Sequence, residues 1–138
     1  MRSVLYMAHP VAPYGDRLVG DNVARAMRWL RWLRRSFPET TFIAPWIAAL
    51  MCGEDDANPA QREAGLVDAD AVIELVDGVV LVGGRISSGM EREAKRAKTS
   101  NGVVFDLTEL GDEPPGPEVE RAVFGWVEFA REFQENRR

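Results

Sequence analysis

A segment near the middle of the chain combines residues that can hold an anion with a carboxylate that can attack a carbon centre. The apolar run from Gly78 to Val82 ends at Gly83 and Gly84, and Ser87-Ser88-Gly89 then opens a helical pattern. Glycine lets a backbone approach a ligand closely, and the free N–H groups at a helix start favour an anion. Glu93 lies one turn into this helix. The same residue spacing is also common where a strand leads into a helix, so a catalytic interpretation needs further evidence from the rest of the chain.

Apolar runs and helical patterns alternate along the chain. Four apolar runs are typical of buried strands: 3–8, 41–44, 78–82 and 102–107. Four helical patterns accompany them: 23–37, 59–76 with a break near Gly65, 88–98 and 117–136. The alternation predicts a single α/β domain over residues 1–138, a flavodoxin/Rossmann-like three-layer sandwich with a parallel sheet of four to five strands.

Ligands of such a sheet bind at the carboxyl ends of the strands. The first strand brings Tyr6, His9 and the following loop to this edge, and the second brings Pro45 and Trp46. The third strand brings the glycine and serine segment, so we expect one site to form from these parts.

Composition limits the function classes. The chain has 138 residues and a net charge of −5, which argues against the basic footprint that nucleic-acid binding requires. One cysteine, Cys52, and one histidine exclude a multi-cysteine or structural zinc site, and we expect neither a metal nor a cofactor. No run is long enough to span a membrane, so we expect a cytoplasmic protein that contacts no membrane.

The first helical pattern has two distinct sides. Asp21 or Asn22 is expected to cap its start. Four arginines are expected to form a solvated side: Arg25, Arg28, Arg31 and Arg35. Four aromatic residues are expected to bury a subunit interface in a homo-oligomer: Trp29, Trp32, Trp126 and Phe129.

The stretch VVLVGGRISSGMEREAKRA resembles the signature of the nucleoside 2-deoxyribosyltransferase-like superfamily, which includes the nucleoside 5′-monophosphate N-glycosidases. The shared pattern falls on Ser87, Gly89 and Glu93, with small residues following. LYMAHP, APW and VDGVVLV are similar to the ends or beginnings of the family's first three strands. The resemblance covers about residues 3 to 107.

The resemblance implies a retaining glycosyl transfer in which Glu93 attacks the anomeric carbon and expels the base. By the same comparison, Tyr6 orients the carboxylate. The transferases of free nucleosides carry an acid where this chain has Ser87, whereas the monophosphate glycosidases carry serine. Ser87 and Ser88 therefore favour a 5′-phosphate, and Arg17 or Arg85 is expected to add positive charge. We include Gly84, Gly89, His9 and Trp46 in the expected binding site.

The chain departs from the family pattern in three places. The acid that helps to protonate the leaving base falls on Ala69, flanked by Asp68 and Asp70, and we take Asp70 as the catalytic candidate. His9-Pro10 stands where many members have glycine. Glu91 offers a second register for the nucleophile, although the count from Ser87 favours Glu93.

These observations predict an enzyme that cleaves the N-glycosidic bond of a (deoxy)nucleoside 5′-monophosphate, or transfers its deoxyribosyl group. Because Ala69 replaces the expected acid, the alternative is a nucleotide-binding module without catalysis on the same scaffold.

Overall fold

The computed structural model describes residues 2–116. It contains one parallel sheet of four strands in the order β2-β1-β3-β4: β1 (Ser3–Ala8), β2 (Thr40–Ile43), β3 (Gly78–Leu81) and β4 (Val103–Asp106). β1 bonds to both β2 and β3, so its carboxyl end lies between those of its neighbours. The predicted α/β class and parallel sheet are confirmed.

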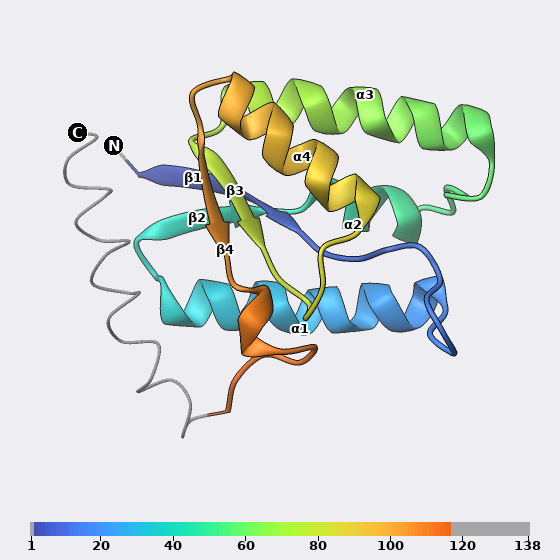
Figure 1. The fold of residues 1–138 in the computed structure, drawn as a ribbon, viewed down its shortest axis with the longest axis horizontal. Coiled ribbons are helices and arrows are strands. Elements are labelled where there is room, and N and C mark those ends of the chain that lie inside the picture. The colour runs from blue at the N-terminus through green and yellow to red at the C-terminus, as the bar shows by residue number, and fades with distance from the viewer. Residues whose placement is uncertain (1, 117–138) are drawn as a thin grey trace.

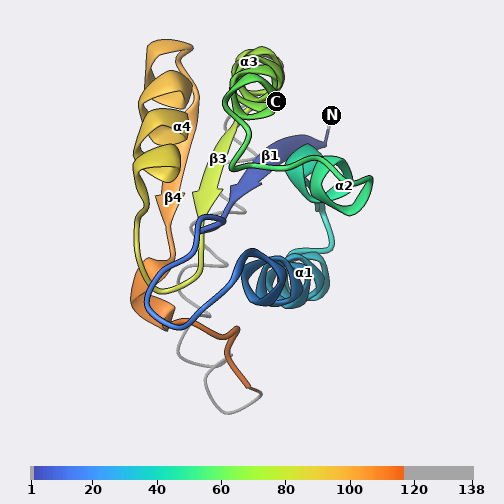
Figure 2. The same ribbon diagram turned by 90° about the vertical axis from the view of Figure 1, so that its right-hand side faces the viewer.

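Helices cover both faces of the sheet (Figure 1). They are α1 (Val19–Ser36), α2 (Pro45–Met51), α3 (Pro59–Leu75) and α4 (Ser88–Thr99), followed by a 3-10 turn at Thr108–Leu110. The end-on view in Figure 2 shows α1 on one side of the sheet and α3 with α4 on the other. These are the three layers of the predicted sandwich.

The alternation of β1 side chains divides the core into two halves. Leu5 and Met7 pack with α1, whereas Tyr6 and Ala8 pack with α3 and α4. All four side chains are at most 4% exposed. The strand is therefore buried on both faces, which explains its continuous apolar sequence.

Two details of the helices differ from expectation. α1 begins at Val19, where the Asp21 carboxylate accepts the backbone N–H of Leu18 at 3.0 Å, so neither Asp21 nor Asn22 is the N-cap. Asn22 is instead buried and donates to the carbonyls of Val11 and Ala12, because the loop after β1 would otherwise leave both acceptors unpaired.

The second helical stretch runs unbroken through Gly65 as α3. Its start is fixed by Asn58, whose side chain accepts the N–H groups of Ala60 and Gln61. The short helix α2 was not expected. It begins at Pro45, whose fixed φ suits the first position of a helix.

The two tryptophans of α1 belong to the core rather than to a subunit interface. Trp29 and Trp32 are 0% and 7% exposed, and their rings pack edge to face with centroids 5.6 Å apart. Trp29 also donates from Nε1 to the Asp112 carbonyl at 2.7 Å. The other two aromatics of the predicted interface, and the predicted helix 117–136, lie outside the described residues.

Part of the arginine side of α1 is paired rather than solvated. Arg25 and Arg28 both donate to Glu113, which lies in the glycine- and proline-rich segment after the 3-10 turn. The described part of that segment, residues 111–116, therefore binds along α1. Among residues 2–116, no helix is both long enough and apolar enough to cross a membrane.

Candidate active site

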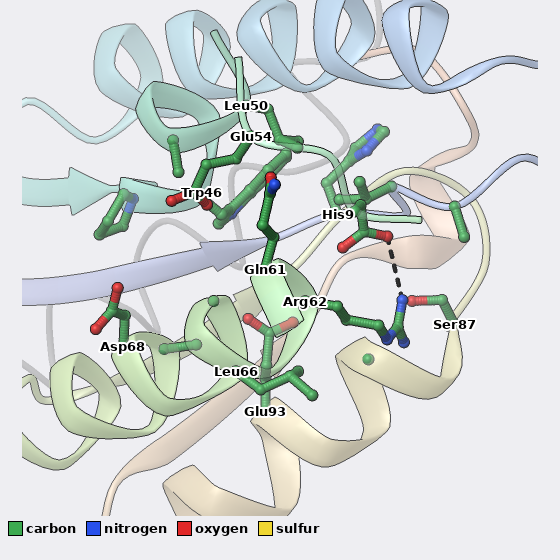
Figure 3. Close-up of a pocket in the computed structure, with 18 of the residues that line it drawn as sticks. His9, Trp46, Leu50, Glu54, Gln61, Arg62, Leu66, Asp68, Ser87 and Glu93 are labelled. Atoms are coloured by element: carbon green, nitrogen blue, oxygen red, sulfur yellow. Dashed lines mark hydrogen bonds and ion pairs between the residues drawn. The ribbon is translucent and has the colours of Figure 1, made fainter. Parts of the chain in front are cut away.

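A pocket of about 190 Å³ opens at the carboxyl end of β1 (Figure 3). Its walls come from the loop after β1, from α2, from the loop between α2 and α3, from α3 and from the start of α4. Of the residues predicted for the site, the structure brings six into its lining beside Glu93: Tyr6, His9, Trp46, Ser87, Ser88 and Gly89.

Glu93 is the carboxylate at the centre of the pocket. It stands in the second turn of α4, is partly buried, and points into the cavity (Figure 3). Burial raises the pKa of Glu93 from 4.5 to about 7. The Tyr6 hydroxyl acts in the opposite direction by donating to the charged form, and the nearby Asp70 carboxylate adds to the rise. Glu93 is therefore ionised in about half of the molecules at pH 7.

Tyr6 is the partner of this carboxylate. Its side chain is 2% exposed beneath α3 and α4, and its hydroxyl donates to Glu93. Burial, and then the charge of Glu93, raise the pKa of Tyr6 far above its usual value. The phenol thus stays protonated at every pH at which Glu93 titrates, and it remains a hydrogen-bond donor to that carboxylate.

The start of α4 forms the wall beside Glu93. Ser87 is the N-cap, and its Oγ accepts the Met90 backbone N–H at 3.3 Å. Ser88 is exposed, and at Gly89 an added Cβ would meet nothing closer than the Ser87 Oγ at 3.9 Å. Bulky side chains therefore do not cover the backbone N–H groups at the start of α4. An anionic group can approach these N–H groups closely.

His9 lies at the back of the pocket and is neutral at pH 7. It is 3% exposed, and its Nδ1 lies 2.7 Å from the Pro10 carbonyl, to which it donates. Burial lowers the pKa of His9 to about 4, so Nε2 carries a lone pair. Within residues 2–116, this Nε2 has no hydrogen-bond partner. Gly83 packs against the ring, with φ at +105° and no room for a side chain.

Trp46 forms an apolar wall. It stands in the first turn of α2, lines the cavity, and donates from Nε1 to the Met7 carbonyl at 2.9 Å. This bond fixes the indole between the two core halves and gives the pocket a flat aromatic surface on which a base can stack.

Three predicted binding residues lie outside the pocket lining. Arg17 pairs with Asp112 at 2.5 Å. The guanidinium of Arg85 lies 4.2 Å above the Tyr14 ring. Gly84, with φ at +83°, packs against Asp112, whose side chain a Cβ at this position would strike.

The acids of α3 are divided between the pocket and the neighbouring helix. Asp70 pairs with Arg92 of α4 at 2.7 Å and does not line the cavity, although its charge reaches Glu93 and Tyr6. Asp68 and Ala69 do line it. Residues two apart on a helix point in different directions, so the choice between Asp68 and Asp70 depended on the rotation of α3 about its axis.

The sequence interpretation missed the wall that the segment after β2 provides. Glu54, Asp55, Asp56, Gln61 and Arg62 all line the pocket. Asp55 and Asn58 organise this loop by local hydrogen bonds to Ala57 and to the first turn of α3. The signal that could have indicated this wall is the turn-rich sequence DDANP directly before a helix. Within the described chain, no three His, Cys, Asp or Glu side chains are grouped to hold a metal ion.

A comparison with family models finds one family that matches most of the chain. The match covers residues 5–105, which include most of β1, the pocket-forming loops and α4. No curated protein matches the chain. The matched family is described as a domain of unknown function, DUF7768, and the chain belongs to it.

Proposed function

We propose that the protein cleaves the N-glycosidic bond of a (deoxy)nucleoside 5′-monophosphate, or transfers its deoxyribosyl group, with Glu93 as nucleophile. The observation that carries the proposal is the Glu93 carboxylate, held by the Tyr6 hydroxyl inside a pocket that also contains an aromatic wall and a helix start. A carboxylate that is partly ionised at neutral pH and accepts a hydrogen bond from a tyrosine hydroxyl can act as the nucleophile toward an anomeric carbon. The resemblance to the nucleoside 2-deoxyribosyltransferase-like superfamily supports the same assignment.

The reaction divides into two steps. An oxygen of Glu93 forms a bond to the anomeric carbon while the bond from that carbon to the base nitrogen breaks, and the base leaves with the electron pair and takes up a proton. In this proposal Asp68, which is the α3 acid among the described residues of the lining, supplies this proton. Water or a second base then attacks the anomeric carbon, and Glu93 is released as a carboxylate.

The test is release of free base from a panel of ribonucleoside and deoxyribonucleoside monophosphates, with the intact protein weighed for a sugar-phosphate adduct. We expect release by the wild type and a loss of at least about 1,000-fold in Glu93→Gln. Glu91→Gln is the matched control, because Glu91 is exposed two residues earlier on the same helix. Equal rates in wild type and Glu93→Gln, or no release from any nucleotide, would overturn the proposal.

A second candidate function is nucleotide binding without catalysis. It is based on the residue at the position where the family pattern has an acid. Ala69 lines the pocket where the family pattern has an acid, and Asp70 is engaged by Arg92. This alternative predicts that nucleotides raise the melting temperature while no base is released. Any release that depends on Glu93 excludes it.

A further inference from the structure

The charge of the pocket presents a difficulty for a phosphorylated ligand. Among the described residues, five carboxylates line it: Glu54, Asp55, Asp56, Asp68 and Glu93. A phosphate monoester carries up to two negative charges at neutral pH and would be repelled by this lining. The two arginines that the sequence suggested as its counter-ions are engaged elsewhere, by Asp112 and by the Tyr14 ring.

Arg62 is the single lysine or arginine among the described residues of the lining. It stands in the first turn of α3, and its side chain extends toward Ser87 at the start of α4 (Figure 3). Its Nη1 donates to the Asp56 Oδ2 at 3.1 Å, and both side chains remain partly exposed, at 44% and 28%. The backbone beneath Arg62 is held in the capped helix, since its N–H donates to the Asn58 carbonyl.

We propose that Arg62 binds the 5′-phosphate of the nucleotide, and that Asp56 holds its guanidinium over the pocket until the phosphate displaces the carboxylate. The inference deepens the proposed function and rests on it for the identity of the ligand. A guanidinium donates two parallel hydrogen bonds to phosphate, whereas Asp56 receives one here. Partly exposed ion pairs are weak, so the exchange costs little.

The exchange of the Asp56 carboxylate for a phosphate would affect which substrates the pocket prefers. A phosphate between Arg62 and the start of α4 places positive charge on one side and helix N–H groups on the other. A free nucleoside offers Arg62 no anion, so the Asp56 pair persists and the pocket keeps its negative lining. Arg62 therefore selects phosphorylated over unphosphorylated substrates, while Glu93 performs the same chemistry on either.

Inorganic phosphate is the first probe, titrated at constant ionic strength and followed by the NMR shift of the Gly89 backbone amide. We expect Arg62→Gln to weaken binding by about 10- to 100-fold, the range for a lost charge-assisted hydrogen bond. Asp56→Asn, which frees the guanidinium, is expected to tighten it. Arg96→Gln is the matched control. Arg96 of α4 forms an ion pair with Glu74 of α3 and lies outside the pocket lining. Equal phosphate binding by wild type and Arg62→Gln, or no binding by the wild type, would overturn the inference.

The activity arm separates this inference from the proposed function. Where the wild type releases base, Arg62→Gln is expected to lower kcat/KM for the monophosphate about 10- to 100-fold and to leave that for the free nucleoside unchanged. Equal losses on both substrates contradict the role of Arg62 while the glycosidase function stands. An inactive wild type that still binds phosphate through Arg62 contradicts the function while the phosphate site stands.

Discussion

Replacing Tyr6 with phenylalanine isolates the interaction on which the proposed chemistry depends. The substitution removes one hydroxyl from a buried side chain and leaves its ring packed beneath α3 and α4. That hydroxyl donates to Glu93 and lowers the pKa of its carboxyl, against the larger opposing effect of burial. Without it, the charged form of Glu93 loses a partner and the neutral form becomes more favourable.

The size of the effect follows from the energy of a charge-assisted hydrogen bond. Such a bond contributes about 1.5–3 kcal/mol, and each pH unit of titration corresponds to about 1.4 kcal/mol. The pKa of Glu93 should therefore rise from about 7 to about 8–9 in Tyr6→Phe. At pH 7 the ionised fraction then falls from about one half to between about one tenth and one hundredth. Base release should fall about 5- to 50-fold at this pH and recover as the pH rises.

Two measurements check this prediction. The first is the titration of the Glu93 side-chain carboxyl by carbon NMR, which requires no activity, and the second is the pH profile of base release. Tyr14→Phe is the matched control, because the chain's other tyrosine is 62% exposed on the loop after β1. If Glu93 titrates at the same pH in wild type and Tyr6→Phe, the hydrogen bond does not control its ionisation and the reasoning is refuted.

Three further predictions concern stability. Because the folded pKa of Glu93 lies above its unfolded value, the free energy of unfolding of wild type relative to Glu93→Gln should fall by up to about 3 kcal/mol between pH 4.5 and pH 8. His9, whose pKa is lowered to about 4 in the fold, adds stability as the pH rises through part of this range, and it does so in both proteins, so the difference between them isolates Glu93. A difference between the two urea-unfolding free energies that does not change with pH would contradict this. Gly83→Ala should destabilise the fold by about 1–3 kcal/mol, because φ at this residue is +105° and the new Cβ would meet His9. Gly20→Ala should instead stabilise the fold slightly, because Gly20 lies on α1 with open space around it. Equal melting temperatures for the two variants would refute this. Asn22→Ala should cost about 1–3 kcal/mol and speed amide exchange in the loop after β1, which unchanged exchange would contradict.

The central part of the fold and site was predictable because it depends on local pattern and on one rule of topology. Continuous apolar runs specify buried parallel strands, and the carboxyl ends of such strands share one edge. Tyr6 lies near the end of β1 and Trp46 follows β2, whereas Ser87 and Glu93 lie at the start of the helix after β3. The structure places all four in one pocket.

Long-range pairing decided what the sequence left open. Arg17 could be seen to follow β1, but its pairing with Asp112, ninety-five residues later, appears only when the chain folds. The position of Asp68 in the pocket, and of Asp70 against Arg92, depends on how α3 is rotated on the sheet.

The sequence by itself thus determined the strands and the layered fold, because hydrophobic periodicity and the alternation of strands with helices are properties of neighbouring residues. The choice of Glu93 came from the resemblance of the segment after β3 to a known family, since the spacing alone is also common between a strand and a helix. Tertiary structure decided which charges face that carboxylate. Asp56 lies in the loop between α2 and α3 and Arg62 lies in the first turn of α3, so neither residue follows a strand end directly. Side-chain pairing of this kind is set by the packing of helices against the sheet, and it carries no periodic signal along the chain.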